Sequence, residues 1–199
     1  MSKETQTAKQ QMENPRKALT EHGILPGDLP ADKMLDRIVR VDHAGEYGAV
    51  RIYEGQLAVL GNSDKADVIR HMVEQEREHL EKFNELIGCR RVRPTALIPV
   101  WHAAGFALGA ATALMGERAA MACTAAVEEV IDEHYANQAA KLGDDEAELR
   151  DTIEKFRADE LEHRDTALHH EAEQTPGYEA LSIVIKKGSR LAIWLSERV

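Results

Sequence analysis

The sequence predicts an all-α fold: a four-helix bundle accompanied by two further helices. Three observations support this prediction. The 199 residues include 5% aromatic residues and only 6 prolines, with abundant alanine, leucine, glutamate and arginine, a composition that favours helix. Apolar residues recur at helical spacing over several long segments. In four of these segments, carboxylate or imidazole side chains occupy positions where packing would call for leucine or valine.

Length and charge limit the number of domains and the classes of function. We expect residues 1–27, which are polar and aperiodic, to form a flexible arm, and residues 28–199 to form one helical domain. The net charge is -10 and no block of Lys or Arg is present, which argues against nucleic-acid binding. Cys89 and Cys123 are far apart and are expected to be reduced thiols. The N-terminal segment lacks the apolar run of a secretory signal.

Two helices, residues 31–60 and 64–87, are predicted to form a first hairpin over residues 31–88. A Gly-Asn-Ser sequence ends the first helix, and Gly88 is expected to end the second. Each helix has an apolar stripe that marks the face directed to the core. The polar residues that interrupt these stripes are Asp42, Glu46, Glu76 and His79.

The apolar segment 95–116 follows the first hairpin. It has nearly the length of a membrane span, but its alanine and glycine content, together with Pro99 and His102, argues against a simple span. A helix buried in the protein, or one lying in the membrane interface, fits the composition better.

A second hairpin is predicted over residues 117–173, with helices at 117–142 and 145–173. The polar residues that interrupt its apolar stripes are Glu128, Glu160 and His163. The last predicted helix, residues 178–198, is amphipathic and mixes Lys and Arg with apolar residues and Trp194. Two interpretations remain open for this helix: a core helix with a solvated basic side, or a helix that touches a membrane surface.

The interrupting residues repeat with nearly constant spacing. Glu46 precedes Glu76 by 30 residues, and Glu128 precedes Glu160 by 32. Each hairpin thus has one inward glutamate on its first helix and a Glu-x-x-His pair on its second, and residues three apart share a helix face. A single Glu-x-x-His pair is expected by chance, but this arrangement is the ligand set of the ferritin-like carboxylate bundles.

Four glutamates that face one core would repel each other and take up protons unless cations neutralise them. Carboxylate and imidazole ligands suit iron or manganese, and the absence of cysteine from the set argues against zinc–thiolate and iron–sulfur sites. We therefore predict a site for two metal ions. The predicted ligands are Glu46, Glu76, His79, Glu128, Glu160 and His163.

Further residues lie close to the predicted ligands in the sequence. Tyr135 and His134 are candidate catalytic residues two helical turns past the first glutamate of the second hairpin, and Tyr53 holds the place of Tyr135 in the first hairpin. The tyrosines either fill the core, the simpler interpretation, or relay protons or electrons. Asp42 and Asp159 are candidate acceptors for the outer ring nitrogens of the ligand histidines. For Asp159 the competing interpretation is a solvated surface acid.

Five sequence motifs resemble those of the 5-demethoxyubiquinone hydroxylase (demethoxyubiquinone monooxygenase) family over about residues 35–199. They are RVDHAGEYGAVRIYEGQLAVL, EREHLEKFNEL, ACTAAVEEVIDEHYANQ, DELEHRDTALHHEAE and LSERV. The resemblance implies a ferritin-like protein with two iron ions (Fe2+/Fe3+) held by the six residues named above. In the VEE sequence it matches the ligand to Glu128, while Glu129 points away.

The resemblance also implies an activity, its partners and a location. The family hydroxylates the ring of a demethoxylated polyprenyl quinone with O2 in ubiquinone biosynthesis, using a reductant such as NADH or a reductase. It acts at a membrane surface, and family analogy adds a lipid-presenting helper protein. Because no presequence is visible, a peripheral bacterial protein on the cytoplasmic face of the inner membrane is implied. The alternatives are a ferritin-like ferroxidase or peroxidase, or a non-enzymatic iron-binding bundle.

Overall fold

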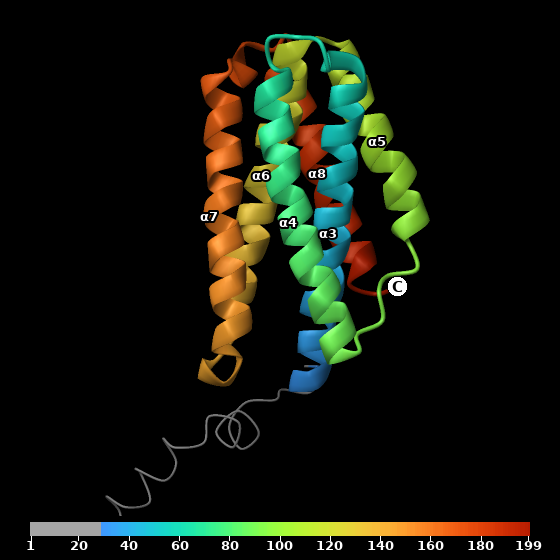
Figure 1. Ribbon diagram of the computed structural model, residues 1–199, viewed down its shortest axis with the longest axis vertical. Coiled ribbons are helices and arrows are strands. Elements are labelled where there is room, and N and C mark those ends of the chain that lie inside the picture. The colour runs from blue at the N-terminus through green and yellow to red at the C-terminus, as the bar shows by residue number, and fades with distance from the viewer. Residues whose placement is uncertain (1–28) are drawn as a thin grey trace, which may run out of the picture.

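The computed structural model describes residues 29–199 and shows an elongated bundle of helices (Figure 1). The predicted N-terminal arm lies outside the described residues. Within them the structure contains helices and no strand, which confirms the predicted all-α fold class. The α-helices are α3 (Ala31–Leu60), α4 (Ala66–Arg90), α5 (Ile98–Leu114), α6 (Glu117–Ala139), α7 (Ala147–His169) and α8 (Tyr178–Ser196), and the short 3-10 helices are η1 (Asp144–Glu146) and η2 (Ala172–Gln174).

The helices α3, α4, α6 and α7 form the central bundle, and α5 and α8 lie outside it (Figure 1). Two apolar clusters fill the bundle, one near each end. The cluster at one end includes Tyr53, Ile69, Met72 and Met121, and the cluster at the other end includes Phe83, Tyr135, Ile153 and Phe156. Along each of the four helices, the predicted ligand positions lie between residues of these two clusters. The predicted site is therefore closed by apolar layers on both sides.

Four of the predicted C-terminal helix ends differ from the structure by two to four residues, and two of them have a clear cause. α4 continues through Gly88 to Arg90, and Arg91 ends it in the left-handed conformation (φ 54), with its N–H directed at the Gly88 and Ile87 carbonyls. Gly88 was wrongly predicted as the end because a glycine inside the last turn keeps helical geometry at modest cost. α7 stops at His169 because Glu171 takes a positive φ of 64 before η2 begins.

Glycines allow α5 to lie directly against α3. A Cβ atom at Gly109 would overlap the Ile52 carbonyl oxygen, and one at Gly55 would overlap the Phe106 carbonyl oxygen. Only glycine permits so close an approach of two backbones. α8 packs mainly against α6. Among the described residues, no helix combines the length and the apolar character that a membrane crossing requires.

Candidate metal centre

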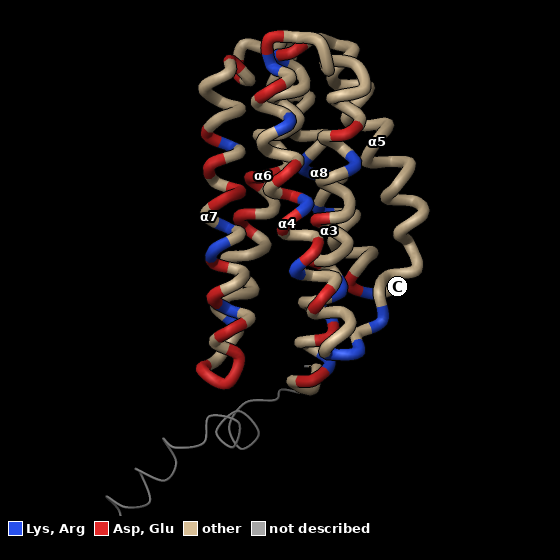
Figure 2. The backbone as a smooth tube through the Cα atoms, viewed as in Figure 1, with Lys and Arg blue, Asp and Glu red and all other residues tan. Residues whose placement is uncertain are grey.

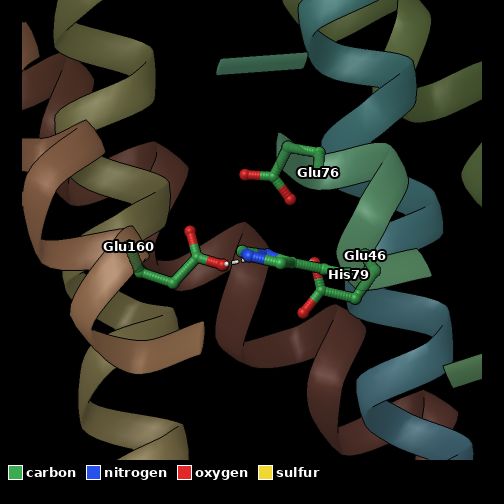
Figure 3. Close-up of side chains that lie close together, drawn as sticks. All are labelled: Glu46, Glu76, His79 and Glu160. Carbon is green, nitrogen blue, oxygen red and sulfur yellow. Dashed lines mark ion pairs between the residues drawn. The ribbon is translucent and has the colours of Figure 1, made fainter. Parts of the chain in front are cut away.

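The six predicted ligands meet in the middle of the bundle, one or two from each of its four helices. They are Glu46 on α3, Glu76 and His79 on α4, Glu128 on α6, and Glu160 and His163 on α7, and each is at most 2% exposed. Figure 3 shows Glu46, Glu76, His79 and Glu160 pointing toward one another from three helices. Four helices bring these side chains together because each carries them on its core-facing stripe.

The six residues divide into two overlapping groups. In one group, atoms of Glu46, Glu76, His79 and Glu160 lie within 4.8 Å of one another, and in the other the same holds for Glu76, Glu128, Glu160 and His163. Glu76 and Glu160 belong to both groups. The arrangement therefore suits two neighbouring cations that share two carboxylates, with one further glutamate and one histidine for each.

The polar atoms directed into this space lack hydrogen-bond partners. The unpartnered atoms are both carboxylate oxygens of Glu76, one oxygen each of Glu128 and Glu160, and the Nδ1 atoms of His79 and His163. Leaving so many buried polar atoms unsatisfied is costly, and metal coordination removes that cost. The donor set of carboxylate oxygen and imidazole nitrogen fits a pair of iron or manganese ions.

The outer nitrogen of each histidine ring faces an acceptor from the opposite hairpin. His79 Nε2 lies 3.1 Å from Asp159 Oδ2, and His163 Nε2 lies 3.1 Å from Gln75 Oε1. These contacts place a proton on Nε2 and leave the Nδ1 lone pair free for a metal. Asp159, for which a surface role competed in the sequence, thus contacts a candidate ligand. Gln75 was missed, because its position before Glu76 carries no signal of its own.

Both buried tyrosines donate hydrogen bonds to glutamates of the other hairpin. Tyr53 donates to Glu128 Oε1 at 2.7 Å, and Tyr135 donates to Glu46 Oε1. Burial, and then the charge of the neighbouring glutamates, raises the pKa of both hydroxyls well above 10, so they remain donors. The tyrosines belong to the apolar clusters and also contact the cluster of acids. Both interpretations of these residues therefore keep structural support.

His134 and Asp42 lie beside the site and do not contact the ligand histidines. Gln138 donates to Asp42 Oδ1 at 2.7 Å, and its Nε2 lies 2.8 Å from His134 Nε2. His134 also lines a cavity of about 250 Å3 between α6 and α8. The role predicted for Asp42, an acceptor for a ligand histidine, does not match these contacts. The apolar stripe predicts that Asp42 is buried, but it does not predict which side chain Asp42 contacts.

Comparison with known proteins supports the resemblance read from the motifs. The protein family described as "Ubiquinone biosynthesis protein COQ7" matches residues 33–196. The chain belongs to this family. A 3-demethoxyubiquinol 3-hydroxylase of Rhodospirillum rubrum is 58% identical over 181 residues, which cover 90% of this chain and 85% of the relative.

Two eukaryotic relatives of this COQ7 family member are also similar over most of their length. The human NADPH-dependent 3-demethoxyubiquinone 3-hydroxylase, mitochondrial, is 56% identical over 169 residues, covering 83% of this chain and 78% of the relative. The 5-demethoxyubiquinone hydroxylase, mitochondrial, of Saccharomyces cerevisiae is 43% identical over 182 residues, covering 83% and 78%. These matches confirm the family predicted from the motifs.

The charges of the COQ7-type site balance by sharing protons when no metal is bound. Burial, and then the charge of Glu160, raises the pKa of Glu76 and of Glu128 well above 4.5. Burial opposes ionisation of Glu160 too, but the neighbouring rings of His163 and His79 outweigh it and lower the pKa of Glu160 to about 2. At His79 burial is outweighed by the neighbouring carboxylates of Glu160 and Glu46, which raise its pKa to about 12. Metal ions must displace these protons to bind.

Proposed function

We propose that this chain is an O2-dependent di-iron monooxygenase that hydroxylates the ring of a demethoxylated polyprenyl quinone in ubiquinone biosynthesis. The observation that carries the proposal is the identity of 58% to a relative named as a 3-demethoxyubiquinol 3-hydroxylase, over 90% of this chain. The COQ7 family matches residues 33–196, which is most of this chain. The buried carboxylate and histidine cluster provides a chemically suitable place for the metal pair.

In this proposal the six candidate ligands would hold two iron ions, and Glu76 and Glu160, which belong to both groups, would be shared between them. Bound iron supplies the redox chemistry with O2 that oxygen insertion into a ring requires. The chain's own residues hold this site in place. The tyrosine hydroxyls fix one oxygen of Glu46 and of Glu128, while Asp159 and Gln75 fix the histidine rings. The apolar clusters at both ends exclude water from the site.

A polyprenyl quinone requires access from a lipid phase, and the outer helices provide an apolar surface for it. α5 carries no charged residue, and Val100, Leu114 and Met115 on or beside it are at least half exposed. On α8, Val184 and Trp194 are likewise at least half exposed. We propose that these two helices contact the membrane from one side, without crossing it.

The distribution of charge supports this orientation. Residues 86–116 and 180–196 contain six cationic residues and no Asp or Glu, so the other segments hold all 35 acidic residues and 25 − 6 = 19 cationic ones. Figure 2 shows α5 without charged residues and cationic positions in the segment that leads into it. The cationic residues are Arg90, Arg91, Arg93, Lys186, Lys187 and Arg190. Anionic lipid headgroups attract such a cationic margin and repel the acidic bundle.

The remaining parts of the proposal concern partners and location. Several relatives are named as NADPH-dependent enzymes, which supports a nicotinamide nucleotide, NADH or NADPH, as the reductant, directly or through a reductase. A lipid-presenting helper protein is proposed by family analogy alone. We also propose a peripheral position on the cytoplasmic face of a bacterial inner membrane; the similar protein of Rhodospirillum rubrum supports only the bacterial part of this location.

Quinone analysis of cells that lack this protein tests the activity. Such cells should accumulate a demethoxylated quinone, and the wild-type chain should restore ubiquinone. Glu128→Gln, which alters a buried candidate ligand, should fail to restore it. The matched control is Glu129→Gln, because Glu129 is the next residue, is exposed and pairs with Lys186 at 2.6 Å. Normal ubiquinone in the deletion strain would exclude the proposed function.

The two alternatives are tested by metal and mass measurements. The proposal expects two iron ions per chain after anaerobic loading, and oxygen consumption that depends on the quinone. A ferroxidase or peroxidase would consume its oxidant without quinone. An iron-storage bundle would form shells of many subunits, which the solution mass would show.

A further inference from the structure

The candidate ligands and the residues that hydrogen-bond to them are of the same types in the two hairpins, with one exception. The matching pairs are Glu46 and Glu128, Tyr53 and Tyr135, Glu76 and Glu160, and His79 and His163. The residue immediately before each Glu-x-x-His pair differs: it is Gln75 in the first hairpin and Asp159 in the second. Among the described residues that hydrogen-bond to the six candidate ligands, only this pair differs in charge between the two hairpins.

The contacts of the two exceptional residues are nevertheless equivalent. Each reaches across to the histidine of the opposite hairpin, and both distances to the Nε2 atom are 3.1 Å. Both side chains lie at the side of the bundle and are partly buried, and the Asp159 side chain is 25% exposed. In the described part of the chain, no Lys or Arg lies within ion-pair distance of Asp159. Its negative charge is therefore directed at His79 and not neutralised by a neighbouring cation.

A carboxylate and an amide have different effects on a metal-bound imidazole. Both accept the Nε2 proton and both fix the ring orientation. Only the carboxylate carries a charge, and a charge-assisted hydrogen bond makes the imidazole a stronger donor at its other nitrogen. His79 therefore has the stronger donor atom of the two histidines, although both Nε2 atoms lie at the same distance, 3.1 Å, from their acceptors.

We propose that Asp159 makes the two cation positions inequivalent. The position formed with Glu46 and His79 binds a divalent cation more tightly, and stabilises its more oxidised state more strongly, than the position formed with Glu128 and His163. Asp159 and Gln75 act as positioning residues, since they reach the metal only through a histidine. The inference rests on the proposed two-metal site and adds that the position formed with Glu46 and His79 binds its cation first.

Cobalt(II) titration of the metal-free full-length protein, followed by its visible absorption, tests the inference. The wild type should bind two ions in two resolved steps. Asp159→Asn should weaken the tighter step about 10- to 100-fold, the range typical for loss of such a partner, and leave the weaker step unchanged. Gln75→Glu should tighten the weaker step and bring the two steps together.

Matched variants separate this role from a general effect of charge or folding. Glu162→Gln removes one negative charge from an exposed position on the same helix as Asp159 and should change neither step. Asp159→Glu retains the carboxylate and should restore most of the tighter step. In the iron-loaded protein, Asp159→Asn should shift one of the two reduction potentials to a more positive value, and Gln75→Glu should shift the other to a more negative value. The melting temperature of the metal-free variants should equal that of the wild type.

The inference is overturned if the wild type binds two ions with one affinity, or if Asp159→Asn and Gln75→Glu shift the same step. Either result would leave the proposed two-metal site standing. A wild-type chain that binds no cobalt would instead remove the proposed site and the order of filling together.

Discussion

The interior of the central bundle and the outer surface of α5 and α8 contain opposite kinds of side chain. The bundle buries four glutamates and two histidines among apolar layers. The two outer helices do the reverse and expose large apolar side chains, with Leu114 76% exposed and Trp194 51% exposed. In Figure 2 the bundle carries most of the acidic positions and α5 carries none.

Buried acidic residues and exposed apolar residues both depart from the ordinary pattern of burial, and each departure indicates a surface that binds a partner. A buried charge without a partner is costly, and so is an exposed apolar face in water. Both features become stable when the missing partner binds, and the partners proposed above are a cation pair in the bundle and a lipid surface at the outer helices. Variants that affect one region and leave the other intact test whether the two departures are independent.

The largest expected effect comes from separating α5 from the bundle. Gly109→Val places a side chain where the Ile52 carbonyl oxygen lies, and overpacking of this kind costs about 3 kcal/mol. Urea unfolding should show this loss of stability, while the folded protein still binds two metal ions. Gly88→Ala is the control, because no atom lies within 4 Å of its added Cβ, and it should stabilise the protein by about 0.5–1 kcal/mol. Wild-type stability of Gly109→Val would disprove the close packing.

Metal binding should stabilise the bundle in a way that depends on pH. A cation at about 100 times its Kd adds about 2.7 kcal/mol to the free energy of unfolding. The gain should shrink as the pH falls, because Glu76 and Glu128, whose pKa values are raised, and His79, whose pKa is about 12, hold protons that compete with the metal.

Thermal unfolding with and without cobalt(II), at about pH 7.5 and about pH 5.5, measures this effect as a difference in Tm. Glu76→Gln, which alters a carboxylate shared by both groups of candidate ligands, serves as the control and should lose most of the gain at both pH values. A gain that grows toward acid pH would contradict the proton competition.

Removing a buried carboxyl group that lacks hydrogen-bond partners should stabilise the metal-free bundle and abolish metal binding. Both carboxylate oxygens of Glu76 lack hydrogen-bond partners, so Glu76→Met should raise the free energy of unfolding by about 1–2 kcal/mol. The same variant should no longer gain stability from metal. Glu78→Gln, an exposed substitution on the same helix, should change neither property. A less stable Glu76→Met protein would show that Glu76 contributes to the fold itself.

The smallest effect on stability is expected at the outer surface. Leu191→Ser and Trp194→Ser change exposed residues and should alter the free energy of unfolding by less than about 0.5 kcal/mol. Sedimentation with phospholipid vesicles should nevertheless show about tenfold weaker binding for the pair, since about 1.4 kcal/mol of lost apolar burial is tenfold in affinity. Binding to anionic vesicles should exceed binding to neutral ones. Val59→Ser, on the bundle, is the control, and equal binding by all proteins would contradict the membrane surface.

The fold and the candidate ligands were predictable because both depend on local periodicity. The bounds predicted for α3, 31–60, agree with the structure, since a long amphipathic stripe and a clear turn define it. Glu46 and Glu128 stood out because a carboxylate on a core-facing stripe must have a partner. The helix ends at Gly88 and near Glu171 were less predictable, because a single left-handed residue decides where a helix stops.

The partners of the ligands could not be predicted from periodicity. Gln75 and Asp159 sit at the bundle rim, where glutamine and aspartate are common without any function. Their contacts with the candidate ligand histidines depend on how α4 and α7 pack against each other, and the local sequence pattern does not predict this packing. Tyr53 and Tyr135 were noticed at matching places, but the crossed direction of their hydrogen bonds appears only when both hairpins are in position.

The hydrogen bonds from each hairpin to the ligands of the other explain why the site needs both hairpins. Each hairpin supplies the tyrosine and the histidine partner that the other hairpin needs, so neither hairpin contains a finished site. Two identical copies of one hairpin, related by a twofold axis, would satisfy the same contacts reciprocally. The present chain has the form of such a homodimer joined into one polypeptide through α5. Two copies of one hairpin would have the same residue at this position, so the difference between Gln75 and Asp159 requires two halves with separate sequences, which one joined chain provides.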